Sequence, residues 1–158
     1  MFTEFMDLPA HPLLVHAAVV FVPLLVLAGI LYAVAPRLRA RLGWVAAVLA
    51  VVGPAAALVA MLSGRELEEV LIAKGYGPAI LNQVATHREY GDLTFWFSLG
   101  LGVATGLMIL AARPRERSWP PAVRHGLSGL VVVLGVVTMV YVYLAGESGA
   151  RAVWTGVL

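Results

Sequence analysis

The chain has 158 residues, of which 61% are hydrophobic and 13% are charged, and it contains no cysteine. Such an apolar composition excludes an ordinary soluble domain, and the lack of thiols excludes disulfides, iron–sulfur ligation and covalent c-type haem attachment. The arginines are split between two short loops that flank apolar segments, which argues against a nucleic-acid-binding surface.

Four uninterrupted apolar segments each have the length that an α-helix needs to cross roughly 30 Å of hydrocarbon. Helices satisfy the backbone polar groups in a layer without water, and the runs lack the alternation of a β-barrel. No internal repeat is evident. We therefore expect an all-α fold, a four-transmembrane-helix up-down bundle that forms a single integral membrane domain over residues 1–158, with helices at residues 12–34, 43–63, 92–112 and 126–145.

The first of these helices does not have the pattern of a cleavable signal peptide. Glu4 and Asp7 precede it, without any Lys or Arg, whereas a signal peptide begins with a positively charged region. We expect this helix to stay in the mature protein as a membrane span.

The connection between the second and third helices, residues 64–90, has helical periodicity of its own. Apolar residues recur at helical spacing around Val70, Gly75 and Gly77 interrupt the pattern, and Pro78 can begin a second helix. We expect a pair of short helices that lies flat over the outer end of the bundle as a lid.

The third helix has a recognisable start and a pair of small residues. Thr86 and Glu89 have the spacing of a capping box, which would make Thr86 the N-cap and put His87 in the first turn. Gly102 and Gly106 form a small-xxx-small pair that allows a neighbouring helix to approach closely.

The distribution of basic residues predicts the orientation. The loops after the first and third helices are rich in arginine, whereas the two ends of the chain and residues 64–90 hold most of the acidic residues. Because positive charge is retained in the cytoplasm, we expect a multi-pass protein of a bacterial plasma membrane. Its N-terminus, its C-terminus and the long connection would then lie outside.

Three histidines and one acidic residue are predicted to gather at that outer boundary. They are His11, His16, His87 and Glu147, and each is adjacent to the end of an apolar segment. The positive end of a helix dipole favours neutral imidazole, the form that binds metals. These four residues are candidate ligands for zinc, iron or copper, although Glu147 has an equally good alternative role as an ion-pair partner of Arg151.

Four segments carry a resemblance to a known family. They read HPLLVH at residues 11–16, SGRELEE at 63–69, HREYGD at 87–92 and GESGARAVW at 146–154. Together they resemble an uncharacterised family of four-helix bacterial membrane proteins, the domain of unknown function 2231, and are most similar to its actinobacterial branch. Some relatives are fused to Rieske or cytochrome c modules, which implies a redox neighbourhood. The family ending usually reads G-H-x-G, whereas this chain has Glu147 at the histidine position.

That departure bears on the kind of cofactor. A carboxylate is an ordinary ligand for zinc, iron or manganese but a poor axial ligand for a b-type haem. A haem would therefore take His16 and His87 as its axial pair. Its propionates would have three arginines as candidate partners, Arg65, Arg88 and Arg151.

Two functions from different classes follow. The first is a redox-associated membrane subunit that holds one b-type haem or one transition metal ion. It would contact the lipid bilayer and redox proteins of the Rieske or cytochrome c type. It would also form a homo-oligomer or join a larger complex. The alternative is a structural or assembly subunit of a larger membrane complex without its own cofactor. An intramembrane hydrolase based on Ser63 or Ser148 is disfavoured because the sequence has neither a nucleophile elbow nor an H-E-x-x-H motif. We therefore do not expect an enzyme that acts alone.

Overall fold

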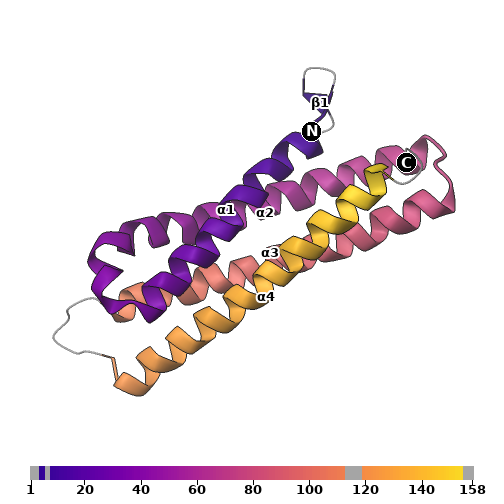
Figure 1. Ribbon diagram of the computed structural model, residues 1–158. Helices are drawn as coiled ribbons and strands as arrows, with labels where there is room; N and C mark the ends of the chain where they lie inside the picture. Colours follow the sequence, from indigo (N-terminus) through magenta and orange to yellow (C-terminus); the bar gives the residue numbers. More distant parts are fainter. Residues whose placement is uncertain (1–3, 6–7, 113–118, 155–158) are drawn as a thin grey trace.

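The computed structural model describes residues 4–5, 8–112 and 119–154. Within them, four long helices run up and down: α1 (Ala10–Val34), α2 (Arg39–Ala73), α3 (Pro78–Ala111) and α4 (Pro121–Trp154) (Figure 1). A 3-10 turn, η1 (Pro36–Leu38), joins α1 to α2, and two-residue strands β1 (Glu4–Phe5) and β2 (Leu8–Pro9) pair before α1. The predicted all-α four-helix bundle is confirmed.

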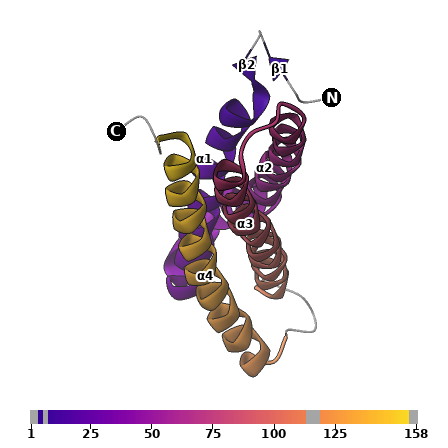
Figure 2. The same ribbon diagram turned by 90° about the vertical axis from the view of Figure 1, so that its right-hand side faces the viewer.

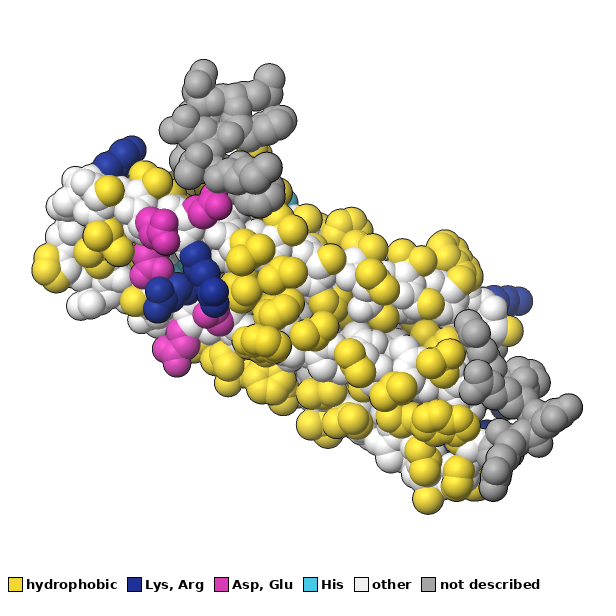
Figure 3. Space-filling view, turned by 180° about the vertical axis from the view of Figure 1, so that it is seen from behind, with side chains coloured by type: hydrophobic (Ala, Val, Ile, Leu, Met, Phe, Trp, Pro, Cys, Tyr) yellow, Lys and Arg dark blue, Asp and Glu magenta, His cyan; other side chains and the backbone are white. Residues whose placement is uncertain are grey.

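All four helices are long and apolar enough to cross a membrane. Hydrophobic side chains cover the middle of the molecule, while charged side chains gather towards its ends (Figure 3). Large apolar residues such as Val51, Trp96 and Val133 are more exposed than buried, which suits a surface in contact with lipid. The chain therefore has the composition and the surface of a multi-pass membrane protein.

The helices form a ring in which each one packs on its two neighbours. α1 and α3 each pack on both α2 and α4, and they face each other across a diagonal of the bundle (Figure 2). Leu25, Leu101 and Val131 are completely buried in the centre. A Cβ at Gly102 would clash with the carbonyl oxygen of Ala50, so this glycine is what allows α2 and α3 to approach so closely.

Of the two glycines predicted to mediate helix packing, only Gly102 does so. A Cβ at Gly106 would meet nothing within 4 Å in the described part of the chain. Gly106 therefore does not require its small size for contact within the bundle.

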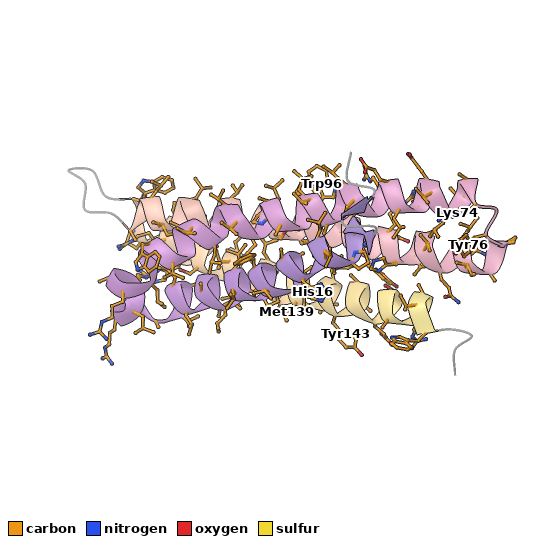
Figure 4. The ribbon with its side chains drawn as sticks, turned by 90° about the horizontal axis from the view of Figure 1, so that it is seen from above. His16, Lys74, Tyr76, Trp96, Met139 and Tyr143 are labelled. Atoms are coloured by element: carbon orange, nitrogen blue, oxygen red, sulfur yellow. The ribbon has the colours of Figure 1, made fainter. Side chains whose placement is uncertain are left out.

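The connection at residues 64–90 is helical, as expected, but it is not a separate lid. α2 and α3 continue through it without interruption up to a short turn at residues 74–77. Helices of 34 or 35 residues are about 50 Å long, well beyond the thickness of the hydrocarbon layer. The hairpin extends past the first turn of α1 and the last turn of α4, with Lys74 and Tyr76 at its tip (Figure 4).

The turn at the tip forms for the reasons that the sequence indicates. Gly75 adopts a φ of 74°, a conformation that only glycine reaches without strain. The N–H of Tyr76 then donates to the carbonyl oxygen of Leu71 at 3.2 Å, as in a Schellman motif. α3 begins with Gly77 as N-cap and Pro78 in the first turn, so the predicted helix start at Pro78 is confirmed.

The predicted capping box at Thr86 is wrong. Thr86 lies inside α3, where its hydroxyl donates to the carbonyl oxygen of Asn82 at 3.1 Å. The spacing of Thr86 and Glu89 also suits neighbouring positions on the surface of an established helix. Since α3 has already begun at Pro78, no free backbone N–H groups remain at Thr86 to be capped.

One end of the bundle, which we call the histidine end, contains the start of α1, the end of α4 and the turn between α2 and α3 (Figure 1). At the opposite end, Arg39 stabilises the C-terminus of α1. Its Nε donates to the carbonyl oxygen of Tyr32 at 2.9 Å and its guanidinium lies 5.5 Å from the centroid of the Tyr32 ring.

The two halves of the bundle, α1–α2 and α3–α4, share short motifs and matching buried positions. Aligning Ser148 with Ser63 pairs Ala-x-x-Ser-Gly at residues 60–64 and 145–149, and Val-Leu-x-Val-Val at residues 48–52 and 133–137. Aligning His87 with His11 pairs buried positions with buried positions: Val22, Leu25, Ala28 and Tyr32 of α1 fall on Ser98, Leu101, Ala104 and Met108 of α3.

These correspondences relate the two halves at positions that the sequence analysis did not single out. Lipid-facing positions accept almost any apolar side chain, so sequence identity between the halves is largely lost there. The matching buried positions show a relation between the two halves that residue identity alone does not show.

Candidate functional site

Two histidines meet inside the bundle at its histidine end. His11 lies in the first turn of α1 and His87 lies in α3, and both side chains are partly buried. Their ring centroids are 6.1 Å apart with an angle of 73° between the ring planes. Because α1 and α3 are diagonal partners, the two imidazoles meet across the bundle.

The His11 ring is held by α2. Its Nδ1 lies 3.0 Å from the hydroxyl oxygen of Ser63, and that hydroxyl donates its own proton to the carbonyl oxygen of Ala60 at 2.9 Å. Since the serine proton is already engaged, Nδ1 of His11 is the donor and the serine oxygen the acceptor. The neutral ring then has its lone pair on Nε2.

The His87 ring is held by α4 in the same manner. Its Nδ1 lies 3.0 Å from the carbonyl oxygen of Ala145 and 3.3 Å from the hydroxyl of Ser148. A carbonyl only accepts, so Nδ1 of His87 carries the proton, and Nε2 again has the free lone pair. The Ser148 hydroxyl donates to the carbonyl oxygen of Leu144 at 2.7 Å.

A glycine next to each serine allows the ring to lie close to the helix backbone. A Cβ at Gly64 would stand 3.0 Å from Cε1 of His11, and a Cβ at Gly149 would stand 2.9 Å from Cε1 of His87. Any larger residue would push the ring away. The Ser-Gly pair thus provides the hydrogen bond and the space for one imidazole in each half.

The site has two free imidazole nitrogens with fixed tautomers. No hydrogen bond to Nε2 of either ring is found within the described residues. Histidines that bind metals commonly donate the other ring N–H to a carbonyl or a similar acceptor, which fixes the ring and raises its basicity as a ligand. His11 and His87 both have such an outer partner.

The other two predicted ligands lie elsewhere. His16 is exposed, and its Nδ1 donates to the carbonyl oxygen of Pro12 at 2.6 Å on its own helix (Figure 4). Glu147 pairs with Arg151 at 2.6 Å one turn along α4. Across residues 11–112 and 119–154, no three His, Asp or Glu side chains gather as a metal cluster. The predicted four-residue group is therefore not assembled, and the axial pair His16 and His87 is not brought together.

The three arginines considered for haem propionates each have a carboxylate partner. Arg65 pairs with Asp92 at 2.9 Å, and Arg88 pairs with Glu68 at 2.9 Å. Arg151 pairs with Glu147. These ion pairs link α2 to α3 along the hairpin and close one turn of α4.

Ser63 and Ser148 contact histidines but do not have the arrangement of a nucleophile. Each hydroxyl donates to a backbone carbonyl and accepts from a ring N–H, so the imidazole is not placed to take the serine proton. Ser63 is moreover only 1% exposed. The serines act as supports for the rings.

The sequence identified both histidines of the pair but missed how they are held. The signal that could have found the supports is the motif Ala-x-x-Ser-Gly, which occurs once after each half's histidine. His125, in the first turn of α4 at the opposite end, is exposed and far from this site.

The chain was compared with protein families, curated proteins and solved structures. No curated protein and no solved structure matches it. The model of one family, described as "Predicted membrane protein (DUF2231)", matches residues 7–158. That match includes both histidines of the pair and both Ser-Gly supports, and it covers nearly the whole chain. The protein therefore belongs to the DUF2231 family of predicted membrane proteins.

Proposed function

We propose that this protein is a redox-associated membrane subunit that binds a transition metal ion or a haem iron through His11 and His87. The observation that carries the proposal is the pair of imidazoles 6.1 Å apart, each with Nδ1 engaged by a neighbouring helix. This narrows the predicted ligand set, because His16 and Glu147 face other partners.

Two independent helices hold the two rings in place, which favours a binding role over incidental packing. Neither Nε2 has a hydrogen-bond partner within the described residues, so both lone pairs are open to a ligand. A ligand that accepts two nitrogen lone pairs would satisfy both atoms together. Fixing each ring in advance also lowers the entropic cost of binding.

The arginine-rich segments at residues 35–42 and 113–124 support an orientation with the histidine end outside a bacterial plasma membrane. A ligand there would be within reach of extracytoplasmic proteins. Because some members resembling this domain are fused to Rieske or cytochrome c modules, a redox protein of that kind is the expected partner class.

Purified protein, expressed with added haem and with trace metals, tests the proposal by absorption spectroscopy and elemental analysis. We expect either a low-spin Soret band or one metal ion per chain, lost in both His11→Ala and His87→Ala. His16→Ala and His125→Ala serve as matched controls and should retain the ligand, because neither side chain contacts the pair.

A folded, colourless and metal-free protein after both treatments would overturn the proposal. It would favour the alternative, a structural or assembly subunit, which predicts that deletion of this protein destabilises a larger membrane complex. Retention of the ligand in His11→Ala would equally contradict the assignment of the site.

A further inference from the structure

We infer that the occupant of the site is a single soft monovalent cation, Cu(I), held in line between Nε2 of His11 and Nε2 of His87. This inference rests on the proposed function and specifies the ligand. Its grounds are the matching positions of the two histidines, the distance between their rings, the number of nearby ligands and the space between the helices.

The internal repeat supplies two equivalent ligands. His11 and His87 occupy matching positions in the two halves, and each ring contacts an Ala-x-x-Ser-Gly motif on the next helix. The two imidazoles thus have matching local surroundings, and their helices α1 and α3 lie on a diagonal of the bundle. Each half thus supplies one ring nitrogen, Nε2, that has no hydrogen bond within the described residues.

The separation of the rings suits one ion between them. Metal–nitrogen bonds of about 2.0 Å on opposite sides of an ion, plus about 1.1 Å from each nitrogen to its ring centre, give a centroid separation of about 6 Å. The observed separation is 6.1 Å. The distance between the rings is therefore compatible with one ion between them, once both Nε2 atoms are turned towards it.

The number of ligands favours Cu(I) over zinc. Zinc takes three or four protein ligands, whereas the described residues bring no third His, Asp or Glu to this pair. The d10 ion Cu(I) accepts a linear geometry with two ligands, and imidazole is among the ligands that suit copper. A single positive charge between two neutral rings is also less costly in a partly buried site than a double charge.

The neighbouring helices argue against a porphyrin. A haem with these axial ligands would lie across the α1–α3 diagonal, so its plane would extend towards α2 and α4. Both helices contact the rings directly: Ser63 lies 3.0 Å from His11 and the carbonyl oxygen of Ala145 lies 3.0 Å from His87. An ion requires no separation of these helices, whereas a porphyrin does.

The test is a competition titration with a chromophoric Cu(I) chelator. The purified, metal-free full chain in detergent is titrated with Cu(I) under anaerobic conditions. Parallel titrations use Zn(II) and haemin. We expect one Cu(I) per chain and an X-ray absorption spectrum with two nitrogen neighbours.

His11→Ala and His87→Ala should each weaken Cu(I) binding by more than the roughly 10- to 100-fold that loss of an outer-sphere partner costs. His87→Phe, which retains a planar ring, replaces His87→Ala if the alanine variant fails to fold. His16→Ala is the matched control, because it removes an exposed histidine from the same end of α1 and should leave Cu(I) affinity unchanged.

The outcomes separate this inference from the proposed function. Tighter binding of haem or of Zn(II), lost with His11→Ala, would overturn the inference and leave the proposed function standing. Binding of none of the three would overturn both. Cu(I) binding that persists in both histidine variants would place the ion elsewhere and would also overturn the inference.

Discussion

The α1–α2 half and the α3–α4 half have buried residues at matching positions but differ around the site. Each contributes one partly buried histidine and one Ser-Gly support to the centre of the histidine end. At the position where the first half has His16, the second has Asp92, and where the second has Glu147, the first has Leu62. The residues that occur in both halves form the pair, and those that differ point to other partners.

Comparing the two halves distinguishes the proposed ligands from the nearby His16 and Glu147 better than residue type does. By composition, His16 and Glu147 are as good a pair of metal ligands as His11 and His87. Only the latter two are in equivalent positions on diagonal helices, where their rings meet. A two-fold arrangement selects them because a central ligand requires the same contribution from each side.

The largest expected effect comes from removing the histidines in combination. If both rings bind one ion, His11→Ala and His87→Ala each abolish high-affinity binding, and the double variant is no worse than either single variant. The double-mutant cycle would then give strong coupling between the two sites. Chelator competition on all four proteins measures it, and additive losses would show that the two halves bind independently.

The next effect comes from the glycines. In Gly64→Ala and Gly149→Ala, the new Cβ would stand 3.0 Å and 2.9 Å from Cε1 of the adjacent ring, so each ring must move. We expect destabilisation of about 1–3 kcal/mol, as in other overpacked sites, with weaker ligand binding in both variants. Gly106→Ala, whose Cβ meets nothing within 4 Å among the described residues, is the control for both measurements.

Thermal unfolding in detergent and chelator competition check this prediction. A Gly149→Ala protein with unchanged stability and affinity would show that the ring shifts without loss, and would contradict this prediction. Equal effects at the two glycines would strengthen the two-fold description of the site.

Replacing the two serines should have unequal effects on ligand binding in the two halves. Ser63 is the side chain that holds Nδ1 of His11, whereas His87 has the carbonyl oxygen of Ala145 at 3.0 Å in addition to Ser148 at 3.3 Å. We therefore expect Ser63→Ala to weaken ligand binding about tenfold, a value typical of an outer-sphere partner. Ser148→Ala should have a smaller effect, and the reverse order would contradict the assigned donors.

The sequence predicted the fold well because length and apolarity decide it. Runs of about twenty apolar residues have few alternatives to a membrane-spanning helix, and the turn at Gly75 and Pro78 follows from backbone chemistry. The extent of α2 and α3 beyond the membrane was missed. Helical periodicity in residues 64–90 does not reveal whether two helices are separate or continuous.

The site was predicted only in part, for a related reason. Topology places His11, His16 and His87 near the same boundary, but it leaves undetermined the side of the helix on which each residue lies relative to its neighbours. His16 lies more than one turn beyond His11 and faces outward. The ring-to-ring contact between α1 and α3 depends on packing across the bundle, and one sequence does not carry that information.

The smallest expected effect is at Glu147. Its carboxylate pairs with Arg151 on the surface of α4, and the arginine side chain is 74% exposed. Exposed ion pairs at this spacing contribute less than about 1 kcal/mol, so Glu147→Gln should change neither stability nor ligand affinity measurably. Glu147→His adds an imidazole that has no matching residue in the first half, where Leu62 stands. If Glu147→His nevertheless changed the coordination seen by X-ray absorption, a third ligand would be within reach, and the two-fold pair would be an incomplete description of the site.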